Sequence, residues 1–211
     1  MREKWIWLPD WASDLALWED DLTDVDPSAN HVFVPYEKMA KNLDDLYKTP
    51  ELSSAATVVG WGMGAFVLLM NAAKRPENQK WILLSPYADF CDEDGVWTEQ
   101  NLTFMARQMQ STIDPALNSF EEQFSEEFGD WQDDWHKAAK KMNAALLAEG
   151  INYLATHKLT NAVEGDNIQV LYGRMDQAIP SVQTLKLKSL LPKAVFRERP
   201  KAGHWPPMLL L

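Results

Sequence analysis

The sequence contains a single cysteine and no long apolar run, and both absences narrow its class. Cys91 cannot form an internal disulfide, so we interpret it as a packing residue in a reducing compartment. No segment approaches the ~20 consecutive apolar residues that a membrane-spanning helix needs. The chain opens Met-Arg-Glu-Lys-Trp, and a charge lies inside each short apolar stretch, so we expect no signal peptide. We therefore expect a cytoplasmic protein with no membrane partner.

Basic residues are missing from two long stretches. No Lys or Arg lies between Lys4 and Lys38 or between Arg107 and Lys137, carboxylates accumulate in both stretches, and the net charge is −11. Binding to nucleic acid requires clustered cations, so this composition argues against a nucleic-acid partner. We interpret most of the carboxylates as a solvated surface that favours solubility.

Histidine and cysteine spacings typical of metal sites are also absent. The four histidines lie far apart and form neither an H-x₃-H nor a C-x-x-C pattern: His31, His136, His157 and His204. The sequence therefore predicts no metal and no cofactor.

Short apolar runs alternate with helical patterns along the 211 residues. Near-continuous hydrophobicity predicts strands covered on both faces by helices, and the alternation predicts right-handed crossovers in a mostly parallel sheet. The predicted strands are Trp5–Leu8, Val32–Val34, Ala56–Val59, Trp81–Leu84, Ile168–Tyr172 and Ala194–Phe196. The predicted helices between them are Tyr36–Tyr47, Met63–Ala73 and Val182–Leu190. The fold class is therefore α/β, with one sheet of about six strands.

A long interval without a convincing strand separates Leu84 from Ile168. It contains helical patterns with aromatic residues at three- and four-residue spacings, which predicts a helical subdomain that packs onto something. The predicted helices are Thr98–Gln110, Pro115–Phe128, Trp131–Leu147 and Leu147–His157. We expect residues 1–88 and 160–211 to form the core, and residues 89–159 to form a lid above the carboxyl ends of the strands, where ligands bind in open α/β folds.

The segment Gly60-Trp61-Gly62-Met63-Gly64 lies between a buried strand and an apolar helix. This is the context in which the motif G-x-S-x-G presents a nucleophilic serine on a strained turn. Position 62 is glycine, however, and carries no hydroxyl, thiol or carboxylate. The sequence therefore predicts the turn without the nucleophile.

Two further segments follow strands in the order that α/β-hydrolases require. Asp176 ends the segment after the strand Ile168–Tyr172, and His204 follows the last strand within Ala202-Gly203-His204-Trp205-Pro206. The order turn, acid, histidine is that of the α/β-hydrolases. Asp176 would orient the imidazole of His204, which would accept a proton.

The loop after the first strand supplies the remaining part of such a site. Hydrolases of this class bind the developing oxyanion with a backbone N–H from this loop and with the N–H that follows the nucleophile. Here those donors would be Trp11 and Met63. Backbone donors do not depend on the side chain at position 62.

These motifs together resemble the BioH-like α/β-hydrolases, the pimeloyl-[acyl-carrier protein] methyl ester carboxylesterases of biotin synthesis. The resemblance rests on Leu8–Trp18, Val58–Val67, Leu146–Leu159 and Leu171–Pro206. It implies the α/β-hydrolase fold, Asp176 and His204 as acid and base, and Trp11 as a residue that lines the site. It also implies that Gly62 occupies the position of the serine nucleophile, and we expect Trp61, Phe120 and Trp205 to line the substrate pocket.

The sequence departs from that family at several positions. Pro9-Asp10 stands where the family carries His-Gly, and only Trp205–Leu211 follow His204, so we expect the first two family strands to be missing and the last helix to be nearly absent. Family lids use arginines to bind the acyl-carrier protein, whereas this insertion is largely acidic, with Arg107, Lys137, Lys140 and Lys141 as the cations of its helical part. A small acyl ester or carboxylic acid is the expected partner, and the carrier protein stays an open alternative.

Three explanations of Gly62 are open at this point. The serine was replaced by engineering, or the protein is a natural pseudoenzyme that binds an ester or acid without turnover. The third explanation is that His204 acts directly on water with the oxyanion hole intact, since removal of a triad nucleophile leaves roughly 10³–10⁴-fold acceleration in a well-studied case.

Two alternatives lie outside ester chemistry. Gly60-x-Gly62-x-x-Ala65 matches a dinucleotide-binding pattern in which glycine at position 62 would be required. The next strand ends at Ser85-Pro86 rather than at an acidic ribose ligand, and this interpretation leaves Asp176 and His204 without a role. The other alternative is an interaction protein whose acidic lid docks a basic partner.

Overall fold

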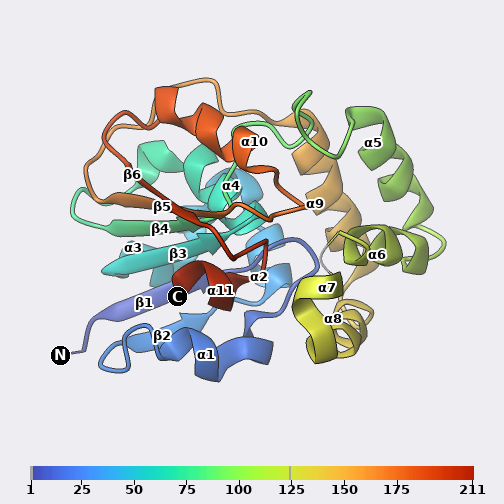
Figure 1. Ribbon diagram of the computed structural model, residues 1–211, viewed down its shortest axis with the longest axis horizontal. Helices are drawn as coiled ribbons and strands as arrows, with labels where there is room; N and C mark the ends of the chain where they lie inside the picture. Colours follow the sequence, from blue (N-terminus) through green and yellow to red (C-terminus); the bar gives the residue numbers. More distant parts are fainter. Residues whose placement is uncertain (1, 124) are drawn as a thin grey trace.

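Six parallel strands form one sheet in the order β2-β1-β3-β4-β5-β6 (Figure 1). The computed structural model describes residues 2–123 and 125–211. The strands are β1 (Lys4–Leu8), β2 (Asn30–Phe33), β3 (Thr57–Trp61), β4 (Lys80–Leu84), β5 (Ile168–Gly173) and β6 (Val195–Arg199). Each contains or overlaps one predicted apolar run, and every neighbouring pair is parallel. The predicted fold class is confirmed.

The helices that connect the strands are shorter than predicted. They are α1 (Glu19–Thr23), α2 (Tyr36–Ala40), α3 (Pro50–Ser53), α4 (Met63–Met70) and α10 (Ser181–Lys186), and a further helix, α11 (Pro206–Leu210), follows β6. The predicted helix Tyr36–Tyr47 is wrong, because α2 ends at Ala40 and a 3₁₀-helix follows at Leu43–Lys48. The buried Asn71 side chain causes the break, since it donates to the Leu43 carbonyl and accepts from the Leu46 N–H. Asn71 also ends α4, so the predicted helix Met63–Ala73 stops three residues early, and the predicted helix Val182–Leu190 is divided between α10 and the 3₁₀-helix Leu187–Ser189.

The described residues between β4 and β5 form five α-helices, which lie together at one end of the sheet, on the right of Figure 1. They are α5 (Glu99–Gln108), α6 (Asp114–Glu121), α7 (Ser125–Phe128), α8 (Gln132–Ala139) and α9 (Ala144–Thr156). The predicted single helix Trp131–Leu147 is wrong: α8 ends at Ala139, and the Asn143 side chain caps α9 by accepting from Ala145 and Leu146. The predicted helix Pro115–Phe128 corresponds to α6 and α7, and residue 124 of that range lies outside the described residues.

The two ends of the insertion meet where they leave the sheet. Asp89 and Lys158 form an isolated antiparallel bridge, and their side chains form an ion pair at 2.9 Å. Among the described residues, no helix combines the length and the apolar character needed to cross a bilayer. Parallel strands end at a common edge, so the loops after β1, β3, β5 and β6 converge beside the insertion.

The close contact between β3 and α4 depends on Gly60. A Cβ atom at this position would lie 2.7 Å from the backbone of Ala65, at the start of the helix. We expect Gly60→Ala to force the strand and helix apart and to lower the free energy of unfolding by about 1–3 kcal/mol, the usual cost of overpacking. Urea denaturation followed by circular dichroism measures this change. Gln100→Ala, on the exposed face of α5, is the control and should stay within about 0.5 kcal/mol of the parent.

Candidate functional site

Gly62 forms the turn between β3 and α4 in a conformation that favours glycine. Its φ is 51° and its ψ is −113°, and its N–H donates to the carbonyl of Leu84 on the neighbouring strand. An L-residue in this region is strained. The turn is therefore the strand-to-helix elbow that the sequence predicts, with its side-chain position pointing into the convergence of loops.

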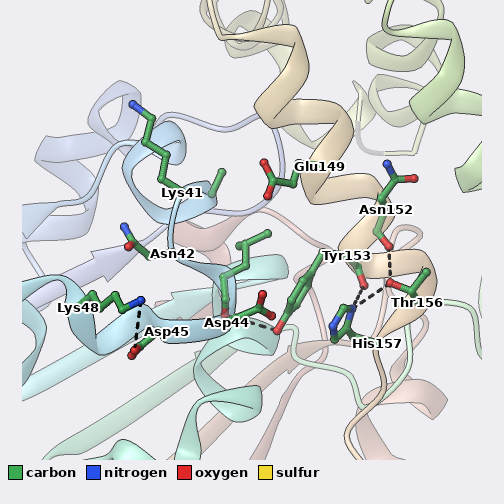
Figure 2. Close-up of a pocket in the computed structure, with 12 residues that line it drawn as sticks. Lys41, Asn42, Asp44, Asp45, Lys48, Glu149, Asn152, Tyr153, Thr156 and His157 are labelled. Atoms are coloured by element: carbon green, nitrogen blue, oxygen red, sulfur yellow. Dashed lines mark hydrogen bonds and ion pairs between the residues drawn. The ribbon is translucent and has the colours of Figure 1, made fainter.

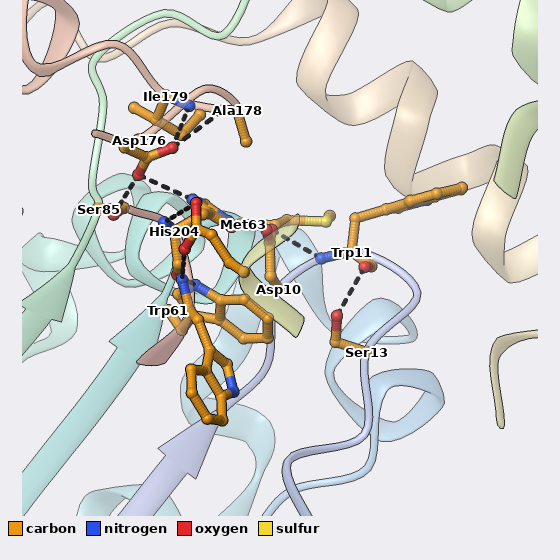
Figure 3. A network of polar contacts seen from close by, with 12 residues as sticks. Asp10, Trp11, Ser13, Trp61, Met63, Ser85, Asp176, Ala178, Ile179 and His204 are labelled. Atoms are coloured by element: carbon orange, nitrogen blue, oxygen red, sulfur yellow. Dashed lines mark hydrogen bonds and ion pairs between the residues drawn. The ribbon is translucent and has the colours of Figure 1, made fainter. Parts of the chain in front are cut away.

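The carboxylate of Asp10 fills the position where a side chain on residue 62 would lie. An ideal Cβ atom on Gly62 would be 2.2 Å from Asp10 Cγ and 2.4 Å from each of its carboxylate oxygens. Asp10 comes from the loop after β1 and is held by hydrogen bonds on both oxygens (Figure 3). A carboxylate from one loop thus takes the place of the side chain that the elbow lacks.

The two predicted oxyanion donors converge on one oxygen of this carboxylate. The Trp11 N–H donates to Asp10 Oδ1 at 2.7 Å, and the Met63 N–H donates to the same atom at 2.6 Å. Both distances are short, as expected when the acceptor is a charged oxygen. The other oxygen, Oδ2, lies 2.8 Å from Nε2 of His204. Asp10 therefore bonds to both predicted oxyanion donors through one oxygen and to the predicted base through the other.

His204 lies between two carboxylates. Its Nδ1 is 2.9 Å from Asp176 Oδ2, opposite the contact with Asp10. Asp176 is fixed in turn, because its Oδ1 accepts the N–H groups of Ala178 and Ile179 and its Oδ2 accepts the hydroxyl of Ser85 at 2.6 Å. The structure thus brings together Asp176, His204 and the elbow, which are far apart in the sequence.

The surroundings of His204 favour its charged form. Burial by itself lowers the pKa of His204, but the charges of Asp176 and Asp10 and their hydrogen bonds outweigh burial and raise that pKa well above its ordinary value of 6.5. The side chains of His204 and Asp176 are each 1% exposed, whereas that of Asp10 is 18% exposed. The two carboxylates therefore favour an imidazolium that donates to both of them.

Two further contacts hold the loop that carries His204. The indole N–H of Trp61, which is buried beneath the site, donates to the His204 carbonyl at 2.9 Å. Glu127 on α7 accepts the N–H groups of His204 and Trp205 at 2.9 and 3.0 Å. Burial raises the pKa of the Glu127 carboxyl, although these two N–H groups act in the opposite direction. The insertion is thus bonded directly to the histidine loop.

Aromatic rings from the insertion pack against Trp11, the residue that follows Asp10. The rings of Trp11 and Phe120 lie 4.3 Å apart, and Phe120 stacks on Trp97 at 4.8 Å. The Trp11 indole donates to the Leu147 carbonyl on α9. Helices α6 and α9 of the insertion therefore contact the site loop directly and give it an apolar wall.

The predicted pocket residues lie at three different places. Phe120 belongs to the aromatic wall beside Trp11. Trp61 lies under His204, with its ring centre 5.2 Å from the imidazole and 5.7 Å from Trp18. Trp205 is half-buried next to His204, and its backbone contacts Glu127.

Sequence reasoning missed the roles of Asp10, Ser85 and Glu127. Asp10 left a signal: it stands beside the loop tryptophan in place of a family glycine, in the same site that lacks a side chain at position 62. Gly62 loses a functional group and Asp10 gains a carboxylate at the same predicted site. These two departures together could have indicated that the Asp10 side chain occupies the space left at Gly62. Ser85 is not a nucleophile replacement in this geometry, because its hydroxyl donates to Asp176. Glu127 lies in an acidic helix and had no distinguishing pattern.

Other parts of the described chain offer less chemistry. A groove of about 400 Å³ lies between the Leu43–Lys48 turn and α9, where Tyr153 stacks on His157 at 3.9 Å (Figure 2). It contains none of the predicted site residues. Within residues 2–123 and 125–211, no three His, Cys, Asp or Glu side chains are grouped to hold a metal ion. The N-terminal N–H of α4, which a pyrophosphate would use, is occupied by Asp10.

Comparisons by sequence find no relatives. No protein-family model matches the chain, and no curated protein sequence matches it.

Comparison by structure finds many similar folds. The hydrolase olei00960 from Oleispira antarctica has a TM-score of 0.79 at 9% identity, over 99% of this chain and 86% of its own. An esterase from Exiguobacterium antarcticum has a TM-score of 0.74 at 16% identity, over 96% and 85% of the two chains. MGS-M2, an α/β hydrolase from a Medee basin deep-sea metagenome, has a TM-score of 0.67 at 14% identity, over 96% and 82%. With its parallel six-stranded sheet, the chain therefore has the α/β-hydrolase fold.

Proposed function

We propose that this protein is a carboxylesterase-type hydrolase, related to the methyl esterases of biotin synthesis, that has lost serine-dependent cleavage of acyl esters. The observation that carries the proposal is the position of the Asp10 carboxylate. Its Oδ1 accepts hydrogen bonds from the N–H groups of Trp11 and Met63, the two predicted oxyanion donors, and its Oδ2 contacts Nε2 of His204. These are the contacts that the acid product of an ester would make in such a site. The protein thus holds its own product analogue.

The Asp10 carboxylate also bears on the origin of Gly62. A serine at position 62 would place its Cβ 2.2 Å from Asp10 Cγ, so the Asp10 carboxylate cannot keep this position beside a serine. An engineered loss of serine would leave a loop that still had room for serine. The matched pair of Asp10 and Gly62 therefore supports a natural inactive form over an engineered one.

The remaining explanations fit the geometry less well. Direct action of His204 on water needs a neutral imidazole with a free Nε2, whereas His204 has a raised pKa and its Nε2 contacts Asp10. A dinucleotide would compete with Asp10 for the start of α4.

The expected ligands are small acyl esters or carboxylic acids rather than a carrier protein. Two of the cations in the insertion are paired, Lys137 with Asp134 and Lys140 with Asp114, which reduces what they could offer an acidic partner. The free thiol of Cys91 fits a cytoplasmic setting.

Removing Asp10 should be necessary before a serine can act. We expect Gly62→Ser alone to give no hydrolysis of p-nitrophenyl butyrate above the parent, because Asp10 fills the space that serine needs. The double variant Asp10→Gly/Gly62→Ser frees both oxyanion donors and supplies the nucleophile. It should raise the rate by about 10³-fold, a conservative share of what a triad nucleophile contributes.

The single variant Asp10→Gly is the matched control for this series. It opens the oxyanion hole without adding a nucleophile, so its rate should stay well below that of the double variant. Equal rates for Gly62→Ser and the double variant would show that Asp10 does not block the site. Background rates for all variants, with circular dichroism showing intact folds, would contradict the proposed carboxylesterase origin.

The charge of His204 should depend on Asp10. We expect the imidazole to stay doubly protonated at pH 7.5 in the parent, and its pKa to fall in Asp10→Asn, which keeps the shape of the side chain and removes its charge. ¹⁵N NMR of labelled histidine follows the titration. An unchanged pKa in Asp10→Asn would mean that Asp176 alone holds the proton.

The same shift has a consequence for stability. A folded-state pKa above the unfolded value of about 6.5 stabilises the protein fully below that pH. This stabilisation is lost as pH rises through the folded-state pKa, by at most about 1.4 kcal/mol per pH unit. The loss should end at a lower pH in Asp10→Asn than in the parent, as urea denaturation across pH 6 to 9 would measure.

A further inference from the structure

The two predicted oxyanion donors of this protein bond to a carboxylate oxygen of its own chain, Asp10 Oδ1. In an acyl-enzyme, the carbonyl oxygen accepts the two backbone N–H groups and the carbonyl carbon is attacked by water. Here the oxygen between the N–H groups of Trp11 and Met63 is Asp10 Oδ1. The carbon that these donors would activate is therefore Asp10 Cγ, as long as its other oxygen carries an ester.

We infer that Asp10 is a catalytic nucleophile toward saturated carbon, and that the site hydrolyses small alkylating electrophiles R–X through an alkyl ester on Asp10. The inference goes beyond the loss of serine chemistry and does not depend on it. It rests on three contacts: two backbone N–H groups on Asp10 Oδ1 and the imidazole of His204 on Asp10 Oδ2.

The occupied oxyanion hole selects the class of electrophile. An acyl substrate develops negative charge on its carbonyl oxygen and needs donors for it, but Asp10 Oδ1 already uses both. Displacement at an sp³ carbon develops no such oxyanion. The substrate class that fits is therefore an alkyl group with a leaving group, such as a primary alkyl halide or sulfonate, rather than an acyl ester.

Burial and neighbouring rings are consistent with a small apolar alkyl group. The Asp10 side chain is 18% exposed, whereas those of His204 and Asp176 are 1% exposed, so Asp10 is the accessible member of the cluster. The next residue, Trp11, packs its ring against that of Phe120 at 4.3 Å and brings apolar surface to this loop. An apolar wall also lowers the local dielectric and strengthens the charge interactions within the site.

The first step forms one bond and breaks one. A lone pair on Asp10 Oδ2 attacks the carbon of R–X, an O–C bond forms, and X⁻ leaves with the bonding electrons. The ester that results is neutral, so Asp10 no longer supports the positive charge of His204, and the proton on Nε2 is released to water. The products of this step are the Asp10 alkyl ester, X⁻, a proton and neutral His204.

The second step restores the starting state. Neutral His204 takes a proton from water as the hydroxide adds to Asp10 Cγ, and Oδ1 becomes an oxyanion held by Trp11 and Met63. Collapse expels the alkoxide, which takes up the proton of the new carboxyl group. Asp10 carboxylate and protonated His204 are regenerated, and the sum is R–X plus water giving ROH and HX. One oxygen of Asp10 then derives from water.

Turnover of 1-bromobutane in H₂¹⁸O tests this path directly. The parent should release bromide and carry ¹⁸O in Asp10, as shown by tandem mass spectrometry of the tryptic peptide Trp5–Lys38. His204→Gln removes the base of the second step, so it should retain one butyl group on Asp10 while turnover falls by about 10²–10⁴-fold. Cys91→Ser is introduced throughout to remove alkylation of the thiol.

Asp10→Asn is the matched control, because it keeps the shape of residue 10 without a nucleophilic carboxylate. It should acquire neither butyl group nor ¹⁸O, and its bromide release should equal that of buffer. Bromide release equal to the parent in Asp10→Asn, or turnover by the parent without ¹⁸O in Asp10, would overturn the inference. So would the absence of both turnover and adduct in folded protein. None of these outcomes changes what the serine variants show about acyl esters.

Discussion

The hydrogen bonds of the Asp10 carboxylate are the constraint on which the rest of the site depends. Its Oδ1 joins the loop after β1 to the start of α4 through Trp11 and Met63, and its Oδ2 meets His204 from the loop after β6. This arrangement requires glycine at position 62, because any Cβ atom there would overlap the carboxylate. It also supplies the second negative charge that raises the pKa of His204.

The contacts of His204 extend this constraint to the remaining loops and to the insertion. Asp176, from the loop after β5, accepts hydrogen bonds from Ser85 after β4 and from two backbone N–H groups. The histidine loop is held by Trp61, which is buried beneath it, and by Glu127 of α7. Every strand that ends at the site except the edge strand β2 thus contributes a polar contact. A charged group so completely bonded is stable in a buried setting, where an unpaired one would be costly.

The hydrophobic pattern of the sequence predicts the strands and the loops that follow them. The six apolar runs locate the strands, and the positions of Asp176 and His204 after their strands follow from the chain order of the fold. Helix ends were predicted less well, because the side chains of Asn71 and Asn143 set them through hydrogen bonds. The roles of Asp10 and Glu127 were not predicted, because they depend on residues that are distant in the sequence. Asp10 bonds to Met63, 53 positions away, and Glu127 bonds to His204, 77 positions away, and only the fold brings these residues together.

A carboxylate and a serine make opposite demands on the same backbone donors. A serine leaves the oxyanion hole empty for the substrate, so the donors act on whichever acyl group enters. A carboxylate whose own oxygen fills the hole excludes that acyl group, yet the donors still favour negative charge on this oxygen. The N–H groups of Trp11 and Met63 therefore stabilise the Asp10 carboxylate in the resting protein. If the other oxygen were esterified, the same two groups would stabilise a tetrahedral oxyanion at Asp10 Cγ. The proposed loss of serine chemistry and the inferred chemistry at Asp10 therefore rest on the same three contacts.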